Sequence, residues 1–124
     1  MVIHESAENY LETILILNQR QGQVRSIDIA NELSFSKPSV SVAMKNLRQN
    51  GYINVNDNGH ITLTEKGLEI ADSVLERHQL ITNLLIALGV TPEVATEDAC
   101  RMEHVISDES FEALKAHAAK FRRA

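Results

Sequence analysis

A four-residue turn, Asn56-Asp57-Asn58-Gly59, constrains the fold of this 124-residue chain more than any other stretch. It separates two runs of β-type residues, 52–55 and 60–63, and the second run alternates polar and apolar side chains. An Asn-Gly pair between such runs favours a tight hairpin, because both residues tolerate the left-handed backbone that the turn requires. We therefore expect a β-hairpin near the middle of the chain.

Helices are expected directly before this hairpin. Residues 7–21 have apolar side chains at the 3.6-residue period of a helix. Ser26 is a suitable cap for a short second helix, and residues 34–36 interrupt it. Ser36 then suits the start of a third helix, with Pro38 in its first turn. Two short helices around a three-residue turn form a helix-turn-helix, and the added hairpin makes it a winged helix.

The third helix has a polar face opposite its apolar positions Val40, Met44 and Leu47. In a winged helix this element enters the major groove of DNA, while the hairpin contacts the backbone or the minor groove. Hydroxyl and basic side chains can bind phosphates or base edges, and an outward valine can contact thymine methyl groups. A solvated face, or a winged helix that binds protein, is the alternative. The candidate DNA-binding residues are Ser36, Lys37, Pro38, Ser39, Ser41, Val42, Lys45, Arg48, Asn58 and His60.

Charge is distributed unevenly along the chain. The net charge is −5, but residues 20–67 carry six Lys and Arg against four Asp and Glu, which leaves +2. A basic module joined to an acidic remainder suits a phosphate-binding half coupled to a cation-binding or oligomerising half. Aromatic residues make up 4% of the chain and tryptophan is absent, which disfavours the stacking of single-stranded bases but not duplex binding.

Residues 64–88 predict the longest helix, roughly 25 residues or about 37 Å. Its apolar side chains fall on two stripes, and so short a chain has few elements to cover both. We therefore expect one stripe to contact a second subunit. The stripes are Leu68, Ala71, Leu75 and His78, and Val74, Ile81, Leu85 and Leu88.

Two domains are expected along the chain. We expect a winged-helix domain over 1–72 and a helical domain over 73–124.

The single cysteine of the chain lies in the sequence Cys-Arg-Met-Glu-His at 100–104, on a helix expected to begin at Thr91-Pro92. Cys100, Glu103 and His104 then lie at positions i, i+3 and i+4, so thiol, carboxylate and imidazole share one helix face. These three groups can bind a metal ion together. The alternative is that Cys100 packs as a small hydrophobic residue.

Several classes of protein are disfavoured. One cysteine allows no internal disulfide, and the first twenty residues have no secretory signal, so we expect a cytoplasmic protein. The longest apolar runs are far shorter than the roughly 20 residues of a membrane span. The chain has no Gly-rich phosphate loop, and outside Cys100, Glu103 and His104 it has no nucleophile paired with a base. We therefore expect neither an enzyme nor a small-molecule substrate.

Several motifs together resemble the diphtheria-toxin-repressor family of metal-dependent transcription regulators, which includes the manganese transport regulators. The likeness extends over nearly the whole chain. It rests on Ala-Glu-Asn-Tyr-Leu-Glu at 7–12, Ser-Lys-Pro-Ser-Val-Ser at 36–41, Leu-Thr-Glu-Lys-Gly at 63–67, Glu-Arg-His at 76–78 and Cys-Arg-Met-Glu-His at 100–104.

The resemblance implies a mainly α fold, in which a winged helix precedes a helical metal-binding and dimerisation domain. It also implies a homodimer that binds a palindromic operator and represses metal-homeostasis genes. Asn9 departs from the aspartate or methionine that the family more often has, and a neutral amide is a weaker ligand than a carboxylate. The implied metal ligands are Asn9, Glu12, His78, Cys100, Glu103 and His104.

The activating metal is inferred from position 100. The iron-responsive branch of the family tends to have cysteine there, and the manganese-responsive branch has glutamate. A thiolate beside imidazole and carboxylate suits Fe(II), Zn(II), Co(II) or Ni(II) better than Mn(II). We expect Fe(II), with Mn(II) second and the other three as binders in vitro. The alternatives are a Mn(II)-responsive regulator, or a winged-helix regulator that senses oxidants or a small molecule through Cys100.

Overall fold

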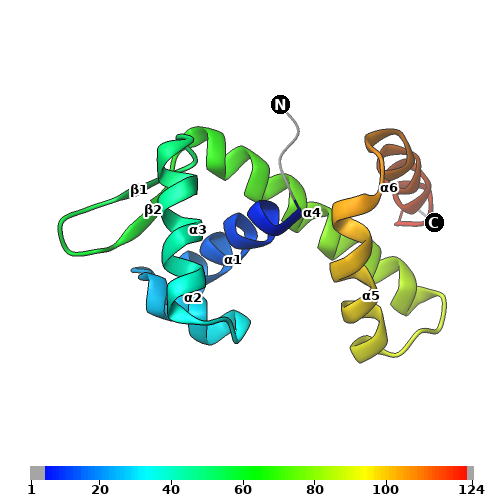
Figure 1. The fold of residues 1–124 in the computed structure, drawn as a ribbon. Helices are drawn as coiled ribbons and strands as arrows, with labels where there is room; N and C mark the ends of the chain where they lie inside the picture. The colour runs from blue at the N-terminus through cyan, green and yellow to red at the C-terminus, as the bar shows by residue number, and fades with distance from the viewer. Residues whose placement is uncertain (1–4, 123–124) are drawn as a thin grey trace. The chain divides into compact units, whose positions relative to one another are not determined.

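The computed structural model describes residues 5–122 and divides the chain into two compact units, Met1–Ser73 and Val74–Ala124. The described residues are mainly helical, with one two-stranded sheet (Figure 1). This confirms the predicted fold class of three helices and a hairpin followed by further helices. The elements are α1 (Glu5–Gln21), α2 (Ser26–Leu33), α3 (Lys37–Gln49), β1 (Ile53–Val55), β2 (Ile61–Leu63), α4 (Glu65–Ala87), α5 (Pro92–Val105) and α6 (Asp108–Arg122).

The core of the N-terminal unit forms where α1 contacts α2 and β2, and where α3 contacts α2 and β1. The apolar period of α1 places Leu11 and Ile14 fully inside. On α3, the predicted inward positions Val40, Met44 and Leu47 are all buried. Helix formation in this unit is therefore stabilised by one apolar face of each helix.

The helix-turn-helix has the predicted cap at one helix and not at the other. Ser36 precedes α3, and its hydroxyl accepts the Ser39 backbone N–H at 3.3 Å. Ser26 was expected to cap α2, but this was wrong, because the extended residue before the helix is Arg25. The Asp28 carboxylate accepts the Arg25 backbone N–H at 2.9 Å, so α2 begins one residue earlier than expected.

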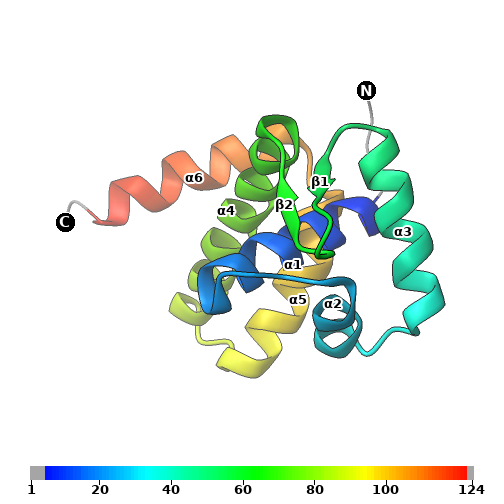
Figure 2. The same cartoon turned by 90° about the vertical axis from the view of Figure 1, so that its left-hand side faces the viewer.

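The hairpin forms as the sequence predicts. β1 and β2 are antiparallel, with Ile53 opposite Leu63, and they lie beside α3 (Figure 2). The Asn56 side chain accepts the backbone N–H groups of Asn58 and His60, and Gly59 has a φ of 79°. The turn therefore uses glycine where a left-handed backbone is required.

The C-terminal unit consists of the second part of α4 with α5 and α6. Thr91 and Pro92 begin α5 as predicted, and Ala95, Ala99 and Glu103 form its buried face. Phe111 and Ala118 are the buried positions of α6. None of the described helices combines the length and the apolar character needed to cross a bilayer.

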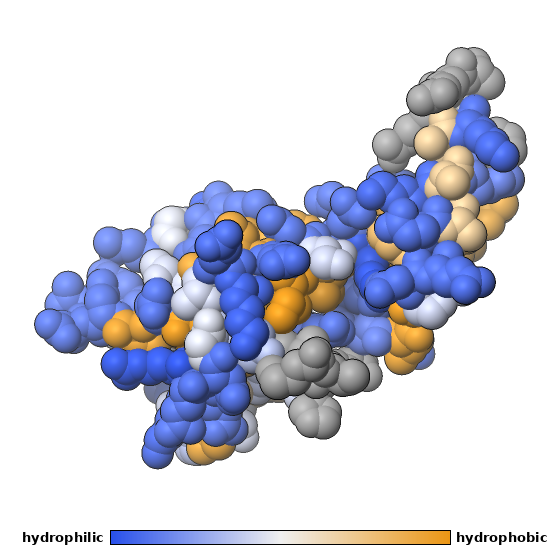
Figure 3. Space-filling view, turned by 90° about the horizontal axis from the view of Figure 1, so that it is seen from above, coloured by the Kyte–Doolittle hydropathy of each residue, from blue (hydrophilic) through white to orange (hydrophobic). Residues whose placement is uncertain are grey.

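An apolar groove of about 580 Å³ lies in this unit. Leu88, in the turn after α4, is 80% exposed. Hydrophobic residues appear among hydrophilic ones on the molecular surface (Figure 3). The walls of the groove include Leu80, Leu84, Leu85 and Leu88 from the end of α4 and the turn after it, with Met102 from α5 and Leu114 from α6.

Candidate metal centre

Helix α5 carries the cluster that the Cys-Arg-Met-Glu-His sequence predicts. The helix is regular over this stretch, so the expected spacing of one turn between Cys100 and the pair Glu103 and His104 is confirmed. The burial differs along the face, because Cys100 is exposed while Glu103 is only 1% exposed. A carboxylate so deeply buried requires polar or charged partners.

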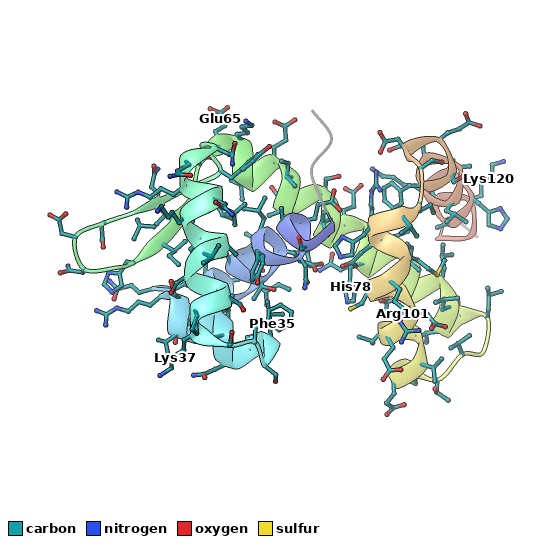
Figure 4. All side chains as sticks on the ribbon, in the orientation of Figure 1. Phe35, Lys37, Glu65, His78, Arg101 and Lys120 are labelled. Carbon is teal, nitrogen blue, oxygen red and sulfur yellow. The ribbon has the colours of Figure 1, made fainter. Side chains whose placement is uncertain are left out.

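Two histidines are the partners of the Glu103 carboxylate. Nδ1 of His78, on α4, lies 2.9 Å from Glu103 Oε2, and Nε2 of His104 lies 3.2 Å from Glu103 Oε1. Cys100 Sγ lies 3.8 Å from the same His78 nitrogen. Figure 4 labels His78 on α4 and Arg101, the residue after the cysteine, on α5. Within the C-terminal unit, the structure therefore brings together His78, Cys100, Glu103 and His104, which are four of the six predicted ligands.

The donor atoms fit a metal ion. One ligand atom each from His78, Cys100 and Glu103 lies within 4.8 Å of the others. Ligand atoms on opposite sides of one ion are separated by at most about twice a bond length of roughly 2.0–2.3 Å. Imidazole, thiolate and carboxylate are the usual ligands of divalent transition metals in proteins. The three side chains can thus hold one ion with a small adjustment of their rotamers.

The two remaining predicted ligands lie on α1, in the N-terminal unit. Asn9 and Glu12 are three residues apart and therefore share a helix face. Asn9 is half-buried, and its backbone carbonyl accepts a hydrogen bond from Thr13 Oγ1 at 2.8 Å. Glu12 is buried, with 6% of its surface exposed. Their roles as ligands stay predictions.

The predicted DNA-binding residues of α3 lie on its exposed side. Figure 4 shows Lys37 at the start of the helix with its side chain directed outward. Val42 is 61% exposed, so its methyl groups are accessible to a binding partner. In the hairpin Asn58 is exposed and His60 is half-buried. The exposed members on or next to α3 are Ser36, Lys37, Pro38, Ser39, Ser41, Val42, Lys45 and Arg48.

One contact of the cluster was not singled out in the sequence. Arg77 precedes His78, and its guanidinium donates to the backbone carbonyls of Glu103 and Ile106. Backbone acceptors leave no trace in a sequence pattern. The available signal was the position of the arginine inside the Glu-Arg-His motif at 76–78.

Two family models match the chain in succession. The model described as "Iron dependent repressor, N-terminal DNA binding domain" matches residues 3–61. The model described as "Iron dependent repressor, metal binding and dimerisation domain" matches residues 64–124. The first match contains α1, α2, α3, β1 and the hairpin turn, and the second contains the histidine, cysteine and glutamate cluster.

Individual relatives agree with these matches. The transcriptional regulator MntR of Escherichia coli O157:H7 is 36% identical over 116 residues, which are 94% of this chain and 75% of that protein. The iron-dependent repressor IdeR of Mycobacterium tuberculosis is 34% identical over 106 residues, 85% of this chain and 46% of that protein. A solved structure of the manganese regulator SloR is 30% identical, with a TM-score of 0.79, and the match covers 96% of this chain and 55% of the SloR chain.

Proposed function

The chain belongs to the diphtheria-toxin-repressor family of iron-dependent repressors, and from this premise we propose that it represses metal-homeostasis genes when Fe(II) is bound. Members of this family are metal-dependent, DNA-binding transcription regulators and not enzymes. The specific metal, the ligand set and the operator are the parts that we propose.

The observation that carries the proposal is the cluster of His78, Cys100 and Glu103, whose donor atoms lie within 4.8 Å of one another. A bound divalent cation would supply a positive charge that joins these side chains. The Glu103 carboxylate, which is almost fully buried, provides the anionic oxygen, and the imidazole and the thiol provide softer donors. His104 completes the cluster through its contact with Glu103.

We further propose that Glu12, with Asn9 as a weaker ligand, adds oxygen donors from α1. The support is the family resemblance of the Ala-Glu-Asn-Tyr-Leu-Glu motif, together with the burial of the Glu12 carboxylate. A ligand from the DNA-binding unit gives metal binding a physical route to operator binding, because it would tie that unit to the dimerisation unit. This is the coupling that a metal-dependent repressor requires.

Fe(II) is favoured over Mn(II) by the chemistry of Cys100. Thiolate is a soft ligand, and Mn(II) is served better by carboxylates, carbonyls and water. The relatives support both metals, since one is named an iron-dependent repressor and another a manganese regulator. Mn(II) is therefore the second candidate, and Zn(II), Co(II) and Ni(II) are expected to bind in vitro.

For DNA, we propose that a homodimer places the two α3 helices in successive major grooves of a palindromic operator. The exposed hydroxyl and basic side chains of α3 support this, as does the match to a DNA-binding domain followed by a dimerisation domain. The two half-sites must then lie about 34 Å apart. An apo dimer whose α3 helices are not fixed at this spacing pays an ordering cost when it binds.

The test is an anaerobic DNA-binding titration. Operator sites are first selected from random duplexes in the presence of Fe(II), and the affinity of the purified protein is then measured without metal and with Fe(II), Mn(II) or Zn(II). We expect Fe(II) to raise the affinity about 5- to 150-fold, the range of a coupling free energy of about 1–3 kcal/mol. An affinity that no metal changes would contradict the proposal.

The rival function, an oxidant or small-molecule sensor that works through Cys100, makes a different prediction for Cys100→Ser. A metal-dependent repressor should lose metal affinity in this variant, and its DNA binding should then need more metal. An oxidant sensor should keep DNA binding but lose its response to peroxide. The match to a metal-binding domain favours the first outcome.

A further inference from the structure

The end of α5 is held by a side chain that is not among the proposed ligands. Arg77 Nη1 donates to the backbone carbonyl of Ile106 at 2.9 Å and, less closely, to that of Glu103 at 3.4 Å. The last carbonyls of a helix have no partner within the helix, so an external donor fixes the position of the final turn. That turn carries both Glu103 and His104.

The same guanidinium also contacts the start of α6. Nη2 forms an ion pair with Asp108, and Cζ lies 5.4 Å from the centre of the Phe111 ring. The Arg77 side chain is only 15% exposed, whereas Asp108 is 92% exposed. An ion pair with so exposed a partner contributes little by itself. The more buried contacts, to the two carbonyls and the aromatic ring, are the ones that fix Arg77.

Glu103 is consequently held at both of its ends by neighbouring residues of α4. His78 contacts its carboxylate at 2.9 Å, and Arg77 donates to its backbone carbonyl. A shift of the last turn of α5 away from Arg77 would therefore also move the Glu103 carboxylate relative to the His78 ring. A metal site tolerates errors of only about 0.2 Å in ligand distances, so small movements of the end of α5 affect binding.

We propose that Arg77 is a positioning residue of the metal centre, which sets the affinity and the ligand geometry by holding the last turn of α5 against α4. The inference rests on the proposed metal-binding function and adds a residue to it. Arg77 touches no metal and acts through Glu103 and His104. Residues that hydrogen-bond a ligating side chain commonly change metal affinity by about 10- to 100-fold when they are replaced, and we expect an effect of this size from Arg77, which holds the backbone of a ligand residue.

The informative variant is Arg77→Met. Methionine has a similar length and can still pack on Phe111, but it donates no hydrogen bond to the carbonyls of Glu103 and Ile106. Lys115→Met is the matched control. Lys115 also ties α6 to α4, through an ion pair of 3.0 Å with Glu76, the residue before Arg77, and this bond involves none of the proposed ligand residues.

The readout is anaerobic binding of Co(II), measured by chelator competition and by absorption. A thiolate ligand gives Co(II) a charge-transfer band, and the ligand-field bands report the coordination geometry. We expect wild type and Lys115→Met to have the same affinity and spectrum. Arg77→Met should bind about 10- to 100-fold more weakly and have altered ligand-field bands. A residue that only stabilised the fold would not alter the spectrum of the loaded protein.

Folding is checked by thermal denaturation of each metal-free protein. If Arg77→Met does not fold, Arg77→Lys replaces it, since an ammonium group keeps the charge but cannot span the same fork of acceptors. If only one of these variants folds, wild-type Co(II) affinity and spectrum in that variant would overturn the role of Arg77. If both fold, wild-type values in both would overturn it. Absence of Co(II) binding in the wild type would instead contradict the proposed function itself.

Discussion

At the scale of single residues, Gly67 is fixed by the backbone beside it. A Cβ atom at this position of α4 would lie 2.0 Å from the carbonyl oxygen of Tyr52. That oxygen also accepts the Thr64 backbone N–H, so it has little freedom to move. The glycine thus allows α4 to begin directly against the residue that precedes β1.

We predict that Gly67→Ala lowers the free energy of unfolding by at least about 1–3 kcal/mol, the usual cost of forcing an extra methyl group into a packed site. Urea denaturation of the metal-free protein measures the change. Glu69→Ala, on the exposed part of the same helix, is the control and should be neutral or slightly stabilising because alanine favours helix formation. Equal stability of the two variants would contradict the expected clash.

The identity of residue 100 makes a second prediction. In Cys100→Glu a carboxylate replaces the thiolate, so the cluster becomes harder and more suited to Mn(II). We expect the ratio of the Mn(II) affinity to the Zn(II) affinity to rise on the order of tenfold, or about 1.4 kcal/mol, by competition with a fluorescent chelator. Cys100→Ala, which removes the donor without replacing it, should weaken both metals. An unchanged ratio would mean that Cys100 does not select the metal.

At the scale of elements, α3 is the helix whose exposed side should determine DNA affinity. Lys45 and Arg48 are exposed and lie three residues apart, so they can contact neighbouring phosphates. We predict that Lys45→Ala with Arg48→Ala weakens operator binding. The negative slope of log affinity against log salt should become shallower by about 1 for each phosphate that the protein no longer neutralises. Binding is measured by fluorescence anisotropy over a range of salt concentrations.

The control for this pair is Lys120→Ala, an exposed cation at the far end of α6. It should leave the salt slope unchanged. If the double variant bound DNA like the wild type, the winged helix would serve another partner, and protein binding would become the leading interpretation of this fold.

The elements were predictable where a local chemical preference decides the backbone. Ser36 accepts an N–H of the first turn of α3, and Gly59 adopts a left-handed φ in the hairpin, so both boundaries could be inferred from residue type. At α2 the predicted cap was wrong by one residue. There the Asp28 carboxylate accepts the Arg25 backbone N–H. From the sequence alone, Ser26 is the more obvious cap because serine is a preferred residue at that position.

The candidate site was predictable only in part for a similar reason. Helical spacing alone brings Cys100, Glu103 and His104 onto one face. The 2.9 Å approach of His78 depends on how α4 packs against α5, which no local pattern encodes, and it was reached through family resemblance. The contacts of Arg77 were missed because two of its partners are backbone carbonyls, which every residue has.

At the scale of the whole molecule, the apolar groove of the C-terminal unit bears on the proposed homodimer. Its lining includes Ile81, Leu85 and Leu88, which belong to one of the two apolar stripes described for this helix. One of those two stripes was expected to contact a second subunit. Leu88 is 80% exposed in the single chain, and an exposed leucine beside an apolar groove is typical of an interface. The match to a dimerisation domain covers this region.

We predict that Leu88→Glu converts the dimer to a monomer at micromolar concentration. An unpaired carboxylate placed in an apolar interface costs about 2 kcal/mol or more, which is roughly 30-fold in the dissociation constant. Sedimentation equilibrium measures the association. Val94→Glu is the control, because Val94 is an exposed apolar residue of α5 that does not line the groove. The monomer should also bind half-sites and palindromes with equal affinity per site, since the second α3 helix is no longer tethered. A Leu88→Glu protein that remains dimeric would place the subunit interface elsewhere.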